Sequence, residues 1–267
     1  MLPQACWLNP AVACSLYQAN IYSMITDPSL YLPLLIAGAF AAAFVIGAVG
    51  FADALILNAV WLHIMEPAAA IPLVVACGIL MHVTPLYKLR KTLDFSRLLP
   101  FALCGVFGVP IGTWALGYME AQHFKTVIGV FLLAYGIWML MRPHTSVGEA
   151  GGRPADGLIG LGGGFMGGFA GLSGLFPTLW VGVRGWSKSR QRGTYQPFVL
   201  IMHALGIVTF AASGMLTMRT GIDFLWCFPA VVVGSWLGVK IYPYLNDALF
   251  KRIILGLILI SGATLLL

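Results

Sequence analysis

Charge is what this sequence has least of. Only 9% of its 267 residues are charged, whereas 60% are hydrophobic, and the mean hydropathy is +0.91. A soluble domain carries about 25% charged residues. The apolar runs exceed the roughly 18 to 20 residues that a helix needs to cross hydrocarbon, and the alternation typical of a membrane barrel is absent. The composition therefore predicts an all-α integral membrane protein.

Other absences exclude further classes of protein. The five cysteines show no metal-ligand spacing, so no metal site or cofactor is expected. The net charge of +6 comes from basic residues in short loops between apolar segments. There they indicate orientation in the membrane, and no nucleic-acid partner is expected. The N-terminus lacks the basic region of a cleavable signal. Residues 1–29 contain three prolines and one charge, which favours an interfacial segment over a span.

Glycine, by contrast, is abundant in one apolar stretch. Eleven of the twenty-nine positions from Gly157 to Gly185 are glycine. This density weakens a plain membrane helix and suits a helix that is broken inside the membrane, where its backbone approaches a ligand or a neighbouring helix. A fainter copy spans Ala37–Trp61. Pro177 suits the first turn of a helix that restarts after such a break.

The two glycine-rich stretches belong to an internal repeat. An offset of 121 to 129 residues relates four pairs of motifs: Phe44-x2-Gly47-x2-Gly50 with Phe165-x2-Gly168-x2-Gly171, Met81-His82 with Met202-His203, Asp94-Phe95-x4-Pro100 with Asp223-Phe224-x4-Pro229, and Phe124-Lys125 with Phe250-Lys251. The predicted organisation is a first membrane repeat at 30–141, a cytoplasmic linker at 142–156 and a second membrane repeat at 157–267.

The basic residues predict how the two repeats are oriented. If each glycine-rich stretch crossed the membrane once, the fifteen Lys and Arg residues would divide seven to eight. If both stretches enter and leave on the same side, thirteen lie on one side, and only Lys125 and Arg219 on the other. The positive-inside rule favours the second arrangement. The predicted fold is therefore two inverted repeats, each a glycine-broken re-entrant hairpin followed by three transmembrane helices.

Two histidines are the sharpest candidates for chemistry. His82 and His203 occupy equivalent repeat positions, ten residues into helices predicted to begin at Pro72 and Gly193, or roughly 15 Å deep. An ionisable residue at that depth is costly and indicates function, although a structural histidine bonded to the backbone is the alternative. Asp53 lies at the first break and either relays protons or caps a half-helix. We predict a proton relay of His82, His203 and Asp53, in which a histidine takes up a proton when an anion binds.

The breaks themselves are expected to bind the anion, because a broken helix exposes N–H groups and the positive end of its dipole. Polar groups near the breaks were also considered, although a membrane hydroxyl more often bonds its own helix; Thr178 is one of them. The predicted substrate-binding residues are His82, His203, Gly50, Asp53, Asn58, Gly171, Ser173, Gly174, Arg192, Tyr195 and Gln196.

The pattern resembles the TauE/SafE sulfite-exporter family over nearly the whole chain after residue 30. The most specific motifs are the hairpin of Gly167–Pro177, then Gly185-Trp186-x-Lys188 and Arg192-Gly193-Thr194-Tyr195-Gln196. The first repeat departs from the family, which often has a run of three glycines where this chain has Gly50-Phe51-Ala52-Asp53. This departure bears on the substrate more than on the fold.

The resemblance implies a secondary transporter, not an enzyme, for sulfite, an organosulfonate or another small anion, coupled to protons. An anion channel with the same broken-helix pore is the alternative. The expected location is the bacterial inner membrane, with lipid, protons and the anionic substrate as partners. The sequence leaves open whether the chain forms a homo-oligomer.

Overall fold

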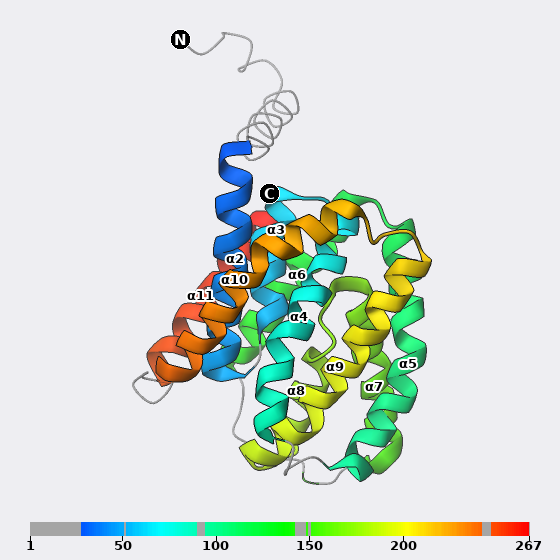
Figure 1. Ribbon diagram of the computed structural model, residues 1–267. Coiled ribbons are helices and arrows are strands. Elements are labelled where there is room, and N and C mark those ends of the chain that lie inside the picture. The colour runs from blue at the N-terminus through cyan, green and yellow to red at the C-terminus, as the bar shows by residue number, and fades with distance from the viewer. Residues whose placement is uncertain are drawn as a thin grey trace, which may run out of the picture.

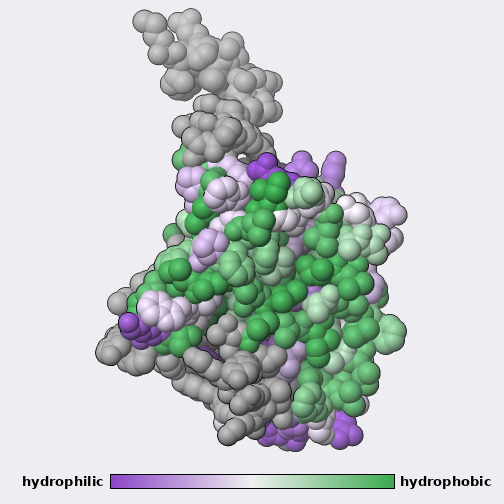
Figure 2. All heavy atoms as spheres, viewed as in Figure 1, coloured by the Kyte–Doolittle hydropathy of each residue, from purple (hydrophilic) through white to green (hydrophobic). Residues whose placement is uncertain are grey.

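The computed structural model describes residues 28–50, 52–89, 94–141, 148, 151–241 and 247–266. Within these ranges the chain forms ten helices and no strand (Figure 1). Four of the helices are long and apolar enough to cross a membrane: Leu30–Ala48, Phe95–Tyr118, Arg190–Ala212 and Met218–Ile241. Hydrophobic residues cover the middle of the face seen in Figure 2, and hydrophilic residues gather towards its two ends. The prediction of a multi-pass helical membrane protein is confirmed.

Each half contains a broken pair of helices and then three helices of at least twenty residues. The first half contains α2 (Pro28–Val49), α3 (Asp53–Ile64), α4 (Pro67–Leu89), α5 (Phe95–Tyr118) and α6 (Ala121–Met141). The second contains α7 (Gly152–Ala170), α8 (Leu175–Val183), α9 (Lys188–Ala212), α10 (Met218–Ile241) and α11 (Asp247–Leu266).

Several boundaries differ from the sequence-based expectation. Residues 1–27, most of the expected interfacial segment, lie outside the described residues, and α2 begins at Pro28. The helix α7 begins at Gly152, so the last five residues assigned to the linker are helical. Pro154 explains this start, because proline fits the first turn of a helix, where its missing N–H is not needed.

The helices that carry the two histidines both begin five residues before their expected starts. Alanines follow Pro67 and favour the helix α4, and the Ser187 hydroxyl caps α9 by accepting a hydrogen bond from the Arg190 N–H. His82 and His203 therefore each lie fifteen residues into their helices, at matching positions.

The two halves exchange contacts reciprocally. The most extensive contacts join α5 with α7 and α10 with α2, so each broken pair packs on a helix of the other half. Glycines allow both contacts. A Cβ on Gly164 would stand 2.0 Å from the Gly105 carbonyl oxygen, and one on Gly238 would stand 2.2 Å from the Phe44 carbonyl oxygen. Other inter-half contacts pair α4 with α9, α6 with α11, α5 with α9, α4 with α10 and α3 with α11.

The connecting segments that carry basic residues lie together at one end of the bundle. The Arg97 guanidinium lies over the Trp186 ring, 5.5 Å from its centroid, and Arg184 donates a hydrogen bond to the Gly152 carbonyl at 3.1 Å. The starts of α5 and α7 and the α8–α9 connection therefore meet at this end, which we call the basic end. The α5–α6 and α9–α10 turns lie at the opposite end (Figure 1). Which end faces the cytoplasm stays a prediction.

Candidate functional site

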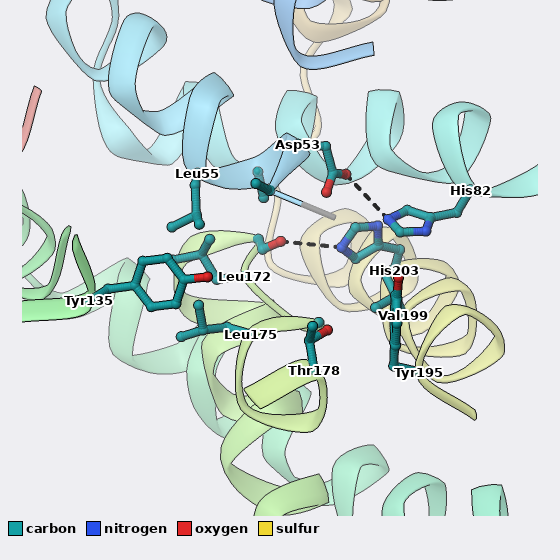
Figure 3. Close-up of a pocket in the computed structure, with 14 residues that line it drawn as sticks. Asp53, Leu55, His82, Tyr135, Leu172, Leu175, Thr178, Tyr195, Val199 and His203 are labelled. Carbon is teal, nitrogen blue, oxygen red and sulfur yellow. Dashed lines mark hydrogen bonds and ion pairs between the residues drawn. The ribbon is translucent and has the colours of Figure 1, made fainter. Parts of the chain in front are cut away.

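One cavity lies where the two breaks meet α4, α6 and α9 (Figure 3). Its empty volume is about 440 Å³, open solvent at its mouth included. The lining residues come from both halves of the chain: Ala52, Asp53, Ala54, Leu55, His82, Tyr135, Gly171, Leu172, Gly174, Leu175, Thr178, Tyr195, Val199 and His203. A cavity shared by two repeats is the usual place for a transporter's site.

The first break separates α2 from α3 with two residues in the left-handed region. Gly50 has φ +90° and Ala52 has φ +79°. Glycine tolerates this conformation without strain, and a Cβ at Gly50 would also meet the Arg192 guanidinium at 2.8 Å. The Gly50 carbonyl accepts a 2.7 Å hydrogen bond from the Tyr195 hydroxyl. The break is thereby bonded to a helix of the other half.

The second break separates α7 from α8. Gly171 ends α7 with φ +72° and donates its N–H to the Gly167 carbonyl at 3.0 Å. Leu172 then donates to the Met166 carbonyl at 3.0 Å, so backbone groups of the break satisfy two carbonyl oxygens near the end of α7. Pro177 lies in the first turn of α8, as expected. The first turns of α3 and α8 both line the cavity, so two positive helix ends converge on it.

The two histidines lie next to each other on one side of this cavity (Figure 3). Their rings are nearly perpendicular, with centroids 5.9 Å apart, and both side chains are buried. His82 Nε2 lies 3.3 Å from Asp53 Oδ2, and His203 Nε2 lies 3.2 Å from the Gly171 carbonyl oxygen. Each histidine is thus bonded to the break of its own half. Both Nδ1 atoms lack a hydrogen-bond partner among the described residues.

Gly78 makes room for the His203 ring. A Cβ at this position of α4 would stand 2.6 Å from His203 Nδ1 and 3.7 Å from Asp53 Oδ2. The glycine therefore allows α4 to approach α9 closely enough for the two histidines to meet.

Most of the predicted site residues come together in this place. His82, His203, Asp53, Gly171, Gly174 and Tyr195 line the cavity. Gly50 and Arg192 lie at its edge, where Gly50 contacts both Tyr195 and Arg192.

Three predicted residues are buried but do not line the cavity. The Asn58 amide donates 2.8 Å hydrogen bonds to the Ala54 and Ala170 carbonyls, which ties α3 to the end of α7. The Ser173 side chain occupies the space beside Gly167. Gln196 follows Tyr195 on α9, and successive helical residues point about 100° apart. The sequence placed Asn58 and Ser173 near the breaks and Gln196 on the helix after the second basic loop, but it could not show which way these side chains face.

Tyr135 is the lining residue that sequence reasoning missed. It lies on α6, far from either break in the chain, and it joins leucines on one side of the cavity, whereas Asp53 and the histidines lie on the other (Figure 3). A tyrosine in the middle of an apolar span was the available signal. Thr178, which was considered but not selected, also lines the cavity.

Metal chemistry has no support in the described part of the chain. There, His, Cys, Asp and Glu side chains form no group of three or more that could hold an ion. The polar side of the cavity offers instead two imidazoles, one carboxylate, hydroxyl groups and helix N-termini, which suit proton and anion binding.

Comparison with known proteins identifies the family. A family model described as "Sulfite exporter TauE/SafE" matches residues 34–265. A search of curated proteins and a search of solved structures each found no match. The matched range covers both repeats and every residue that lines the cavity. The chain therefore belongs to the sulfite exporter TauE/SafE family, a family of membrane transporters.

Proposed function

We propose that this protein is a secondary active transporter that moves a small anion, such as sulfite or an organosulfonate, together with protons across the bacterial inner membrane. The family description supports the anion class. The observation that carries the proposal is the cavity, because the first turns of α3 and α8 and both buried histidines line it. Helix N-termini and protonated imidazoles attract negative charge, and burial strengthens the attraction.

The hydrogen bonds of His203 support proton coupling. A carbonyl oxygen can only accept, so the Nε2 atom beside Gly171 must carry a hydrogen. In the neutral ring, Nδ1 then bears a lone pair, which repels an anion. His203 can donate to an anion through Nδ1 only after it has taken up a proton there.

Charge balance gives the expected ratio of protons to anions. A buried site is most stable when each charge has a counter-charge nearby. His82 can balance the Asp53 carboxylate, since the two groups are 3.3 Å apart. A monovalent anion then requires a second cation, which His203 provides by protonation. We therefore expect one proton to enter with each monovalent anion.

The reciprocal packing supports inverted repeats. A two-fold relation between equivalent halves would exchange the α5–α7 contact with the α2–α10 contact and would pair α4 with α9 and α6 with α11, and these pairs are among the contacts observed. Alternating access in inverted-repeat transporters rocks such halves around a central site.

Cysteines placed near Arg153 and Arg190 should react with an impermeant reagent from the same, cytoplasmic side. Reaction from opposite sides would exclude this topology.

The test of the function is uptake into liposomes that contain the purified protein. A thermal-shift screen of sulfite, thiosulfate, sulfoacetate, taurine and simple carboxylates first selects a ligand, since a ligand that binds the folded state stabilises it. Uptake of that ligand should saturate, and a pH gradient should drive it uphill. Flux that neither saturates nor runs uphill would instead favour the anion channel.

Variants connect transport to the cavity. His82→Gln and His203→Gln should each reduce uptake strongly, because each removes a proton-binding group from the cavity. His123→Gln is the matched control, since His123 is an exposed histidine paired with Glu120 outside the cavity. Equal uptake by all three variants would contradict the proposed site.

A further inference from the structure

A second cavity lies at the basic end, between the starts of α5 and α7. Its empty volume is about 650 Å³, open solvent included, and it is lined by Ser96, Arg97, Pro100, Gly152, Arg153 and Asp156. No residue lines both this cavity and the one that holds the histidines. It is therefore a separate place on the molecule, and the proposed function does not use it.

The charges around this second cavity favour a negatively charged ligand. Arg97 and Arg153 line it directly. Its one lining acid, Asp156, already accepts from Arg184 at 3.0 Å and from the Trp180 indole at 2.8 Å, with both members of the ion pair buried. Asp94 lies nearby, but its carboxylate caps α5 by accepting from the Arg97 N–H. The arginines thus dominate the field at the cavity.

Arg190 strengthens this field. Arg97 and Arg190 lie over the Trp186 ring, at 5.5 and 4.4 Å from its centroid, and Arg184 lies at 5.6 Å, although its charge is balanced by Asp156. Stacking on one indole holds Arg97 and Arg190 near each other. Like charges so close favour an anion that can be shared between them.

An apolar surface begins at the rim of the same cavity. On α5, Phe95, Leu99 and Leu103 are 69%, 57% and 58% exposed, at a spacing of four residues that places them on one face. On the neighbouring helix α7, Leu158 is 72% exposed. This face runs along α5 from the basic end towards the middle of the membrane span Phe95–Tyr118.

We propose that this cavity binds the phosphate headgroup of an anionic phospholipid, with an acyl chain along the exposed face of α5. Basic pockets between transmembrane helices are known places for such headgroups. A free inorganic anion would use the arginines but leave the apolar face unused, so the combination favours a lipid. The lipid would stabilise the seam between α5 and α7, and α7 leads directly to the break at Gly171.

The test compares lipids and anions on the intact protein. Purified protein is supplied with phosphatidylglycerol or phosphatidylcholine in mixed micelles, and the lipid retained is counted by native mass spectrometry while the melting temperature is recorded. Phosphatidylglycerol should be retained and should raise the melting temperature, whereas phosphatidylcholine should do neither. Inorganic phosphate forms the third arm. If phosphate alone reproduces the stabilisation, the site binds a free anion and the lipid proposal fails.

Variants localise the lipid. Arg97→Gln with Arg153→Gln should weaken phosphatidylglycerol binding about thirtyfold, because each basic residue near a headgroup contributes about fivefold. Lys240→Gln is the control, since Lys240 is an exposed basic residue on α10 beside Trp236. Leu99→Gln should weaken binding without touching any arginine, which tests the acyl surface even if the double variant folds poorly. Equal retention of both lipids, or a loss of equal size in Lys240→Gln, would overturn the proposal.

Discussion

The most exacting prediction concerns the number of protons that enter the cavity with an anion. His203 has its Nε2 hydrogen committed to the Gly171 carbonyl at 3.2 Å, and its buried Nδ1 has no partner among the described residues. In the proposed mechanism the anion accepts a hydrogen bond from Nδ1, which must then be protonated. This mechanism predicts that a proton is taken up on binding and that affinity falls as the pH rises.

The magnitude follows from the proton count. With one proton per anion, the dissociation constant rises tenfold for each pH unit over the range in which His203 is neutral in the free protein and protonated in the complex. Each unit corresponds to about 1.4 kcal/mol of binding free energy. The anion should be a simple alkylsulfonate, because it stays monovalent throughout and adds no titration of its own.

Calorimetry measures this number directly. Titrations at pH 8 in two buffers with different ionisation enthalpies give the protons taken up per anion, and we expect a value near one. His203→Gln should reduce the value to near zero. Asp53→Asn combined with His82→Gln removes the first pair without leaving an unbalanced charge, so it should keep a value near one.

Two results would refute the reasoning. Wild-type protein that binds the anion without taking up protons would show that the backbone and helix N-termini suffice. An undiminished proton uptake in His203→Gln would show that another group carries the proton. The exposed His123→Gln variant reports any effect of replacing a histidine elsewhere.

Three further predictions follow from the packing. Gly78→Ala places a Cβ 2.6 Å from His203 Nδ1 and should weaken anion binding about tenfold or more, since overpacking costs about 1 to 3 kcal/mol. Unchanged affinity would contradict the close contact between α4 and the His203 ring. Gly164→Ala should lower the melting temperature, because its Cβ would stand 2.0 Å from the Gly105 carbonyl oxygen, whereas Gly221→Ala, with no described atom within 4 Å of the new Cβ, should not. Arg184→Gln leaves Asp156 buried without its cation and should lower the free energy of unfolding by about 3 to 5 kcal/mol. Replacing both residues of the pair, with Met and Leu, should recover most of the loss. A denaturation series that shows no recovery would argue against a buried ion pair.

The sequence was sufficient to place the two breaks. Glycines that must adopt positive φ, such as Gly50 and Gly171, recur with the repeat, and the conformation they require is local. The repeat likewise placed His82 and His203 at matching positions, since equivalent positions in two copies of one helix reach equivalent depths. The starts of α5 and α7 lie beside the α8–α9 connection. This fits the charge count, which places the basic residues of these segments on one side of the membrane.

Side-chain direction could not be predicted in the same way. Asn58 is close to the first break in sequence and Gln196 follows the cavity residue Tyr195, yet neither lines the cavity, because the rotation of each helix depends on which helices pack together. Tyr135 reaches the cavity from α6 only because α6 packs beside the breaks in the folded protein. Sequence proximity predicts neither effect, since both are set by tertiary contacts.

The site is built from two similar units that differ in one chemical respect. Each half contributes a histidine bonded to its own break, but His82 meets a carboxylate and His203 meets a backbone carbonyl. The offset of 121 residues that relates the histidines places Gly174 opposite Asp53, so the second half has no side chain where the first has an acid. The carboxylate gives His82 a permanent counter-charge. His203 lacks one, so the proposed mechanism predicts that it holds an extra proton most readily when an anion is bound and that the second half of the chain takes up the proton.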